Sequence, residues 1–241
     1  MWQDFAADFV KNFITENRWE LILKGFGNTL LITLFSGIMG IVIGVFVAIV
    51  RSTYDTMGAE MKKRGGIGSF LFSVINKLCN IYLTVIRGTP VVVQLMLMYF
   101  FVFASSDNGV FVAIIAFGIN SGAYVAEIFR SGIAAVDKGQ FEAGRSLGFN
   151  YFQTMLYIVI PQMFKIVLPT LCNEFIVLLK ETSVAGYVGV PDLTKAGERI
   201  QGATFSAFMP LVAVALIYLA VVMLFTSLVK KLERRLRNSD H

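Results

Sequence analysis

Charged and polar side chains stand inside an otherwise apolar stretch of this sequence, Asn120–Arg130. Tyr124 and Glu127 follow Asn120 at offsets of four and seven, so the three side chains share one helical face. Glu127 and Arg130 are three residues apart, a spacing at which opposite charges pair on a helix. Ionisable groups in a membrane bundle indicate a functional site by default. The other interpretation is an ion pair that only stabilises the bundle.

A second set of chemically specific residues lies in the polar segment 131–150. Asp137 is a predicted N-cap, Lys138–Leu147 a predicted short helix, and Gly148 its C′ stop residue. A helix of about ten residues is not stable by itself in water. We therefore expect it to persist only when docked, and a cytoplasmic protein is the expected partner.

The segment Arg87-Gly88-Thr89-Pro90 interrupts the apolar region Phe70–Ala104. Proline removes a helical hydrogen bond and disfavours the helical conformation of the residue before it. One interpretation is a broken helix that lines a pathway, with Gln94 one turn beyond the break. The other is a span boundary with Arg87 as its anchor. The region is read either as one broken span or as two.

A third polar set follows a proline-containing apolar stretch. Pro161 and Pro169 are eight residues apart and predict kinks in this helix. Asn173 and Glu174 then mark a face that does not contact lipid.

The composition determines what kind of element must hold these residues. The chain of 241 residues is 56% hydrophobic and only 15% charged, with a mean hydropathy of +0.70, whereas soluble domains carry about 25% charged residues. We expect an all-α integral membrane protein with about five transmembrane helices, since each needs about 20 apolar residues. The apolar stretches are Thr29–Val50, Phe70–Ala104, Val110–Ala126, Met155–Leu179 and Ala207–Val229. Between the first two, Ser52–Ser69 is predicted to be a polar loop.

Basic residues cluster after the first and the last span, which argues against nucleic acid as the reason for the net charge of +5. Such clusters mark the cytoplasmic side of a membrane, so the N-terminus is predicted outside and the C-terminus inside. We divide the chain into an outer interfacial segment (1–24), a transmembrane domain (25–229) and a basic cytoplasmic tail (230–241). The first segment carries Trp2, Phe5, Phe9 and Phe13 at helical spacing. It is either an interfacial amphipathic helix or a functionless tail.

Several other kinds of site are not expected. The chain has one histidine, His241, and two cysteines, so histidine-based catalysis and metal sites are not predicted. Gly139, Gly144, Arg145 and Ser146 nearly match a phosphate-binding loop, but no lysine or preceding strand accompanies them. Gly40 and Gly44 form a GxxxG pattern. It indicates either close helix packing or the ordinary tolerance of membrane helices for glycine.

The polar segment resembles the cytoplasmic signature of the permeases of bacterial ATP-binding-cassette importers. That signature is Glu-Ala-Ala, three residues, Gly, nine residues, Ile, one residue and Leu-Pro. Here the sequence has Glu142-Ala143-Gly144, Gly148 and Ile160-Pro161. Gly144 departs from Ala, and Ile160 from Leu. Further motifs resemble the polar amino-acid (histidine/glutamine) branch over residues 20–230; they are Arg87–Pro90, Asn120–Arg130, Lys138–Glu142, Pro161-Gln162 and Asn173–Ser183.

This resemblance implies a type I ABC importer permease fold in a bacterial inner membrane. It implies that the short helix sits in a groove of an ATPase subunit, with coupling residues Gly139, Gln140, Phe141, Glu142, Ala143, Gly144 and Gly148. ATP and Mg²⁺ would belong to a partner ATPase dimer, and this chain would bind no cofactor and would not be an enzyme. The other implied partners are a second permease chain, an external amino-acid-binding protein and membrane lipid.

We therefore expect an ATP-driven importer of a polar amino acid; the alternative is a secondary transporter driven by an ion gradient. Secondary transporters usually contain internal repeats with paired broken helices, and no convincing second copy of the Arg87–Pro90 break is present. An amino acid needs donors for its carboxylate and acceptors for its ammonium group. The expected substrate path is Thr89, Gln94, Asn120, Tyr124, Glu127, Arg130, Asn173 and Glu174.

Overall fold

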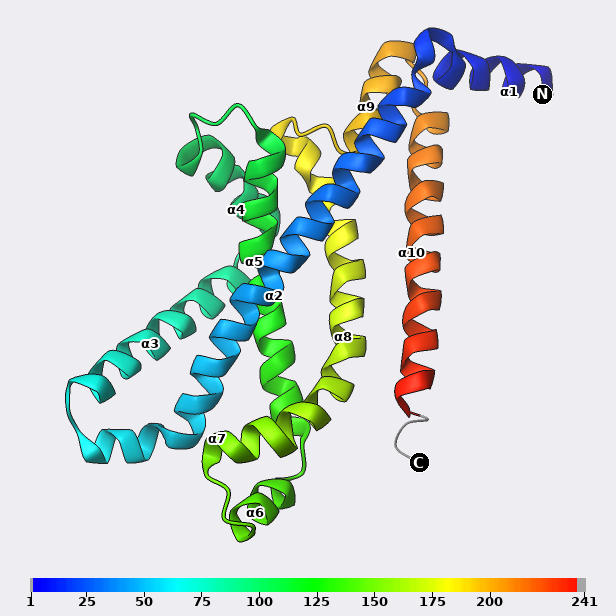
Figure 1. Ribbon diagram of the computed structural model, residues 1–241. Coiled ribbons are helices and arrows are strands. Elements are labelled where there is room, and N and C mark those ends of the chain that lie inside the picture. The colour runs from blue at the N-terminus through cyan, green and yellow to red at the C-terminus, as the bar shows by residue number, and fades with distance from the viewer. Residues whose placement is uncertain (1, 238–241) are drawn as a thin grey trace. The chain divides into compact units, whose positions relative to one another are not determined.

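The structure is a computed structural model that describes residues 2–237, and its regular elements there are all helices (Figure 1). Five stretches within these residues are long and apolar enough to cross a membrane. They are α2 (Trp19–Arg64), α3 (Ile67–Gly88), α5 (Gly109–Ala135), the run of α7 (Tyr151–Thr154), η4 (Met155–Val159), α8 (Ile160–Glu181) and η5 (Thr182–Val188), and α10 (Phe208–Arg237). The predicted all-helical fold with five spans is confirmed. His241 lies outside the described residues.

The remaining described elements are short. They are α1 (Trp2–Phe9), η1 (Val10–Ile14), η2 (Thr15–Asn17), α4 (Val91–Leu97), η3 (Met98–Val102), α6 (Lys138–Ser146) and α9 (Leu193–Thr204).

The predicted polar loop at Ser52–Ser69 is wrong, because α2 remains helical to Arg64. Polar side chains do not end a helix when they can face water, and Thr56 Oγ1 donates to the carbonyl of Ser52, one turn earlier (3.0 Å). The turn is confined to Gly65 and Gly66, which have φ values of 66° and 94°. Glycine adopts such conformations without the steric penalty that a Cβ atom brings.

The predicted break at Arg87–Pro90 is present. α3 ends at Gly88, Thr89 is extended (φ −124°, ψ 148°), and α4 begins directly after Pro90. The region Phe70–Ala104 thus consists of most of one span followed by the shorter apolar pair α4 and η3.

The chain packs as two compact units, each built from segments far apart in the sequence. The first unit comprises the residues up to Gly37, Pro90–Gly118 and Phe175–Leu228. The second comprises Ile38–Thr89, Ile119–Glu174 and the residues from Val229.

Apolar side chains from six α-helices and two short helical turns form two cores in the first unit. Ile32 of α2, Leu95 of α4, Phe117 of α5 and Leu178 of α8 are fully buried together. A second cluster joins α2, α9 and α10 to Phe13 of η1.

The N-terminal segment is attached to α9 by hydrogen bonds. The Asn12 side chain is fully buried, donates to the carbonyl of Asp8 (2.8 Å) and accepts from Thr204 Oγ1 (2.7 Å). Phe5 and Phe9 of the predicted aromatic line remain exposed. The segment that carries this line is therefore docked at its C-terminal end, where Asn12 bonds to α9. Its position at the outer membrane interface stays a prediction.

Glycines bring α2 and α5 together in the second unit. A Cβ atom at Gly40 would lie 2.8 Å from Ser121 Oγ, and one at Gly44 would lie 2.5 Å from Val125 Cγ1. Small residues at such positions allow membrane helices to approach closely. Of the two interpretations of the GxxxG pattern, the structure supports close packing.

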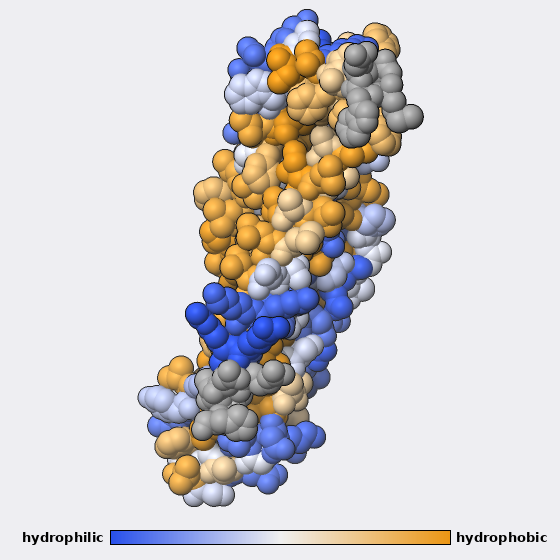
Figure 2. Space-filling model, turned by 90° about the vertical axis from the view of Figure 1, so that its right-hand side faces the viewer, coloured by the Kyte–Doolittle hydropathy of each residue, from blue (hydrophilic) through white to orange (hydrophobic). Residues whose placement is uncertain are grey.

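The outer face of α10 is suited to lipid. Its exposed side chains include Leu216, Leu219 and Met223, and Figure 2 shows hydrophobic residues gathered along this side of the molecule. Lys230 and Arg234 are exposed near the end of the helix. The apolar surface therefore ends at the basic segment that the sequence assigns to the cytoplasmic side.

The close packing of α2 predicts a position-specific effect of added methyl groups. Gly44→Ala should destabilise the protein by about 1–3 kcal/mol through overpacking against Val125. Gly27→Ala, in the same helix but with no atom within 4 Å of the added methyl group, should be neutral or gain up to about 1 kcal/mol in helix propensity. The free energy of unfolding of both variants is measured in mixed micelles and compared with that of the wild type. Equal losses of stability would contradict the packing.

Candidate functional site

The short helix α6 has a complete cap at each end. At the start, Asp137 Oδ1 accepts a hydrogen bond from the Gly139 amide (2.6 Å). At the other end, Gly148 has φ +81°, its amide donates to the Arg145 carbonyl (2.9 Å), and the Phe149 amide donates to the Gly144 carbonyl (3.0 Å). This pair of bonds is a Schellman motif. The predicted N-cap and stop residue are confirmed, and the helix ends at Ser146, one residue earlier than predicted.

One face of α6 is seated on the chain through Gly144, which is buried. A Cβ atom there would lie 2.7 Å from both Thr154 Oγ1 and Thr154 Cγ2, and 3.2 Å from Ile158 Cδ1. Gln162 of α8 adds a polar link, because its Nε2 donates to Gln140 Oε1 (3.1 Å). α6 is therefore attached to both the start and the body of one membrane span.

The other face of α6 has no cover from the described residues of this chain. Leu147, an apolar residue, is 72% exposed just after the helix. Of the predicted coupling residues, Gly144 is buried and Gln140 and Phe141 are half-buried. The exposed members are Gly139, Glu142, Ala143 and Gly148.

Sequence reasoning missed the residues beneath α6. Asn150 and Gln153 form a capping box at the start of α7: each side chain accepts from the other's backbone amide at 2.9 Å. A polar cap residue followed three positions later by Gln is a readable signal. Thr154, by contrast, contacts Gly144 only through the tertiary fold, and no sequence signal identifies it.

A charge cluster, formed by Arg87, Tyr124, Glu127 and Arg130, lies in the second unit. Arg130 donates two hydrogen bonds to the Glu127 carboxylate, from Nη2 to Oε1 at 2.5 Å and from Nε to Oε2 at 3.2 Å. The predicted pairing of these two residues is confirmed. Arg87 adds a second guanidinium, with Nη1 3.5 Å from Glu127 Oε2 and its central carbon 5.8 Å from the centre of the Tyr124 ring. Sequence reasoning left Arg87 out of the substrate path.

The other predicted path residues are distributed over both units. Thr89 Oγ1 donates to the Val85 carbonyl (2.8 Å), and Glu174 accepts from Ser121 Oγ (3.4 Å). Asn120 is buried and Asn173 is exposed. These residues belong to the second unit, whereas Gln94 belongs to the first. The structure thus brings Tyr124, Glu127 and Arg130 of the predicted set together with Arg87 within the second unit.

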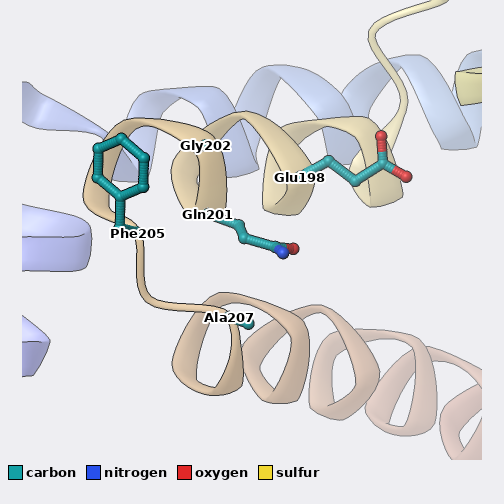
Figure 3. Close-up of a pocket in the computed structure, with 5 residues that line it drawn as sticks. All are labelled: Glu198, Gln201, Gly202, Phe205 and Ala207. Atoms are coloured by element: carbon teal, nitrogen blue, oxygen red, sulfur yellow. The ribbon is translucent and has the colours of Figure 1, made fainter.

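An open pocket of about 550 Å³ accompanies α9 in the first unit. Its lining residues are Glu198, Gln201, Gly202, Phe205 and Ala207 (Figure 3). The Phe205 ring is 95% exposed although its backbone has φ +56°, a conformation that disfavours non-glycine residues.

Asp192 fixes the start of α9. Its buried carboxylate accepts from the amides of Thr194 (3.1 Å) and Lys195 (2.9 Å). Burial raises the pKa of Asp192 above its usual value, and the hydrogen bonds from the two amides oppose this rise. Asp192 therefore acts as the structural N-cap of α9.

The chain matches the family model described as "Binding-protein-dependent transport system inner membrane component" over residues 65–238. It is 34% identical to the Arginine transport system permease protein ArtQ of Bacillus subtilis, over 91% of this chain and 94% of that protein. It is 33% identical to the Glutamine transport system permease protein GlnP of Escherichia coli K12, over 90% and 93% of the two chains.

Solved structures give the same likeness. One is described as "Crystal structure of an amino acid ABC transporter with histidines"; it has a TM-score of 0.79 and 37% identity over 92% of this chain and 98% of that chain. The MetNI methionine ABC transporter in an inward-facing form has a TM-score of 0.74, over 90% of this chain and 97% of that chain. At 19% identity, the second likeness shows the fold alone.

The seat of α6 predicts that Gly144 and Thr154 depend on each other. Gly144→Ala should loosen α6 and speed amide hydrogen exchange in residues 138–149 by about tenfold, because about 1.4 kcal/mol of overpacking is introduced. Thr154→Ala removes the clashing atoms, so the double variant should return close to the wild-type rate. Additive effects of the two changes would contradict the contact.

Proposed function

Because this chain belongs to the family of binding-protein-dependent transport system inner membrane components, we propose that α6 is the element through which a separate ATPase subunit moves it. The chain is the permease subunit of an ATP-driven amino-acid importer in a bacterial membrane. The energy of ATP hydrolysis then has to reach the membrane spans from a separate subunit. It has to pass through a surface of this chain that is firmly attached to those spans.

The structure of α6 is the observation that carries this proposal. One face is fixed to α7 and α8 through Gly144 and Gln140, and the opposite face presents Glu142 and Ala143. A nine-residue helix gains too little from its own hydrogen bonds to persist in water. A second docked surface on the exposed face explains why an apolar side chain such as Leu147 is left uncovered.

Displacement of α6 would be transmitted by two contacts. The Gly144–Thr154 contact bears on the first turn of the fourth span, and the Gln140–Gln162 hydrogen bond bears on α8. ATP and Mg²⁺ would bind and react on the ATPase dimer, and closure of that dimer would move α6 as a unit. In this scheme, the permease itself holds no cofactor and performs no covalent chemistry.

The order of the candidate spans supports opposite sides of the membrane for α6 and α9. α6 lies between the third and fourth candidate spans and α9 between the fourth and fifth, so one crossing separates them. The basic residues near the end of α10 indicate the cytoplasmic side. This orientation puts α6 and the C-terminus in the cytoplasm, and puts the N-terminus and α9 outside, where an amino-acid-binding protein would deliver substrate.

A second permease chain would complete the pathway. Five spans enclose little space for a full alternating route, and two-fold pairing is the commonest closure of such assemblies. The substrate would be a polar amino acid, since the relatives are named for arginine and glutamine transport. In addition to the residues of the charge cluster, the candidate path residues remain Thr89, Gln94, Asn120, Asn173 and Glu174.

The coupling role predicts an uncoupled phenotype for Gly148→Asp. At φ +81° an aspartate is strained and the Schellman motif opens, so α6 should lose its orientation while the spans stay inserted. ATP-dependent uptake into proteoliposomes should fall at least tenfold, and the ATPase should continue to hydrolyse ATP without responding to the binding protein.

Gly68→Asp is the matched control. Gly68 is an exposed helical glycine with no atom within 4 Å of an added Cβ, and it follows the turn that joins the first two spans. ATP-dependent uptake by the Gly68→Asp variant should stay near the wild-type rate. Normal uptake by Gly148→Asp would refute the coupling role, and uptake abolished by ionophores without any need for ATP would favour a secondary carrier.

A further inference from the structure

The charge cluster holds more positive charge than it neutralises. Two guanidinium groups, from Arg87 and Arg130, share the single carboxylate of Glu127. Two further charges act on the cluster: the Arg51 guanidinium attracts the Glu127 carboxylate. The Asp55 carboxylate attracts the Arg130 guanidinium. Three arginines against two carboxylates leave a net charge of +1 beside a membrane-spanning helix.

The two arginines do not hold Glu127 equally. Arg130 makes both close contacts and engages both carboxylate oxygens. Arg87 has one contact, at 3.5 Å, to an oxygen that already accepts from Arg130 Nε. A guanidinium carries five N–H donors, so this single long contact leaves Arg87 with donor capacity for another anion.

The cluster is also open to its surroundings. The side chains of Arg87 and Arg130 are 42% and 41% exposed, whereas that of Glu127 is 27% exposed. Charged groups in spans avoid lipid and face a wet cavity or another polar chain. Another carboxylate of this unit, that of Glu174, accepts from Ser121 Oγ of α5 (3.4 Å). Ser121 lies about 9 Å from Glu127 along the helix axis, at 1.5 Å per residue.

We propose that Arg87 binds the α-carboxylate of the amino acid in transit, exchanging its ion pair with Glu127 for one with the substrate. Arg130 keeps Glu127 in place, and the Tyr124 ring supports the guanidinium in both states through a cation–π contact. The permease itself then selects for an α-carboxylate and against amines that lack one. The inference rests on the proposed function only in requiring that an amino acid passes through this chain.

Direct binding separates this role from a structural ion pair. The importer, with its ATPase and in lipid nanodiscs, is titrated without binding protein against each of the common radiolabelled L-amino acids. Arg87→Gln should weaken binding about 10- to 100-fold, the effect of losing a charge-assisted hydrogen bond, and Arg87→Lys should fall between this variant and wild type. Arg199→Gln, an exposed arginine of α9, should bind as wild type does.

Glu127→Gln gives the decisive contrast. It removes the carboxylate that competes with substrate, so its affinity should equal or exceed that of wild type. Agmatine and the α-amide of each bound amino acid should not compete with that amino acid in wild type.

Four results would overturn the proposal: normal binding by Arg87→Gln, a Glu127→Gln variant that loses affinity tenfold or more, effective competition by the amides, or no direct binding of any common L-amino acid. ATP-dependent uptake by the wild type is measured in parallel. If the wild type takes up amino acid with ATP and the Arg87→Gln variant binds it normally, this inference alone is refuted. If the wild type shows no ATP-dependent uptake, the proposed function is refuted.

Discussion

The contact between Gly144 and Thr154 is the constraint on which the rest of this structure depends. A helix as short as α6 has no independent stability in water, and it keeps its position because a residue without a side chain lets it lie directly against the fourth span. The caps at Asp137 and Gly148 fix its length, and the Gln140–Gln162 hydrogen bond fixes its rotation. This short helix is thereby held firmly against the fourth candidate span.

The helix α6 and the charge cluster belong to one unit of the chain. α5 carries Glu127 and Arg130 and leads into α6 through Val136, which is buried in a core with Phe129 and Met163. A motion of α6 would therefore act on a link that is packed against α5, the helix that carries Tyr124, Glu127 and Arg130. Within this unit, the proposed site of energy input and the proposed site of substrate contact would thus be joined by a packed apolar core.

The features that sequence reasoning predicted correctly are those set by neighbours in the chain. Helical spacing predicted the Glu127–Arg130 pair, and cap chemistry predicted both ends of α6. Contacts made by the tertiary fold were not readable, such as Thr154 beneath Gly144 and Arg87 beside Glu127. The loop expected after the first span failed because polarity was taken as a sign of irregular structure, although an exposed helix satisfies its polar groups equally well.

The most direct test of the account is the sidedness of α6. In a cysteine-free background, Glu142→Cys and Glu198→Cys introduce single thiols on α6 and α9, both at exposed positions. A membrane-impermeant maleimide should label Glu142→Cys only in inside-out vesicles and Glu198→Cys only from outside intact cells. Labelling of Glu142→Cys from outside would contradict the account, because no cytoplasmic ATPase could then reach the helix.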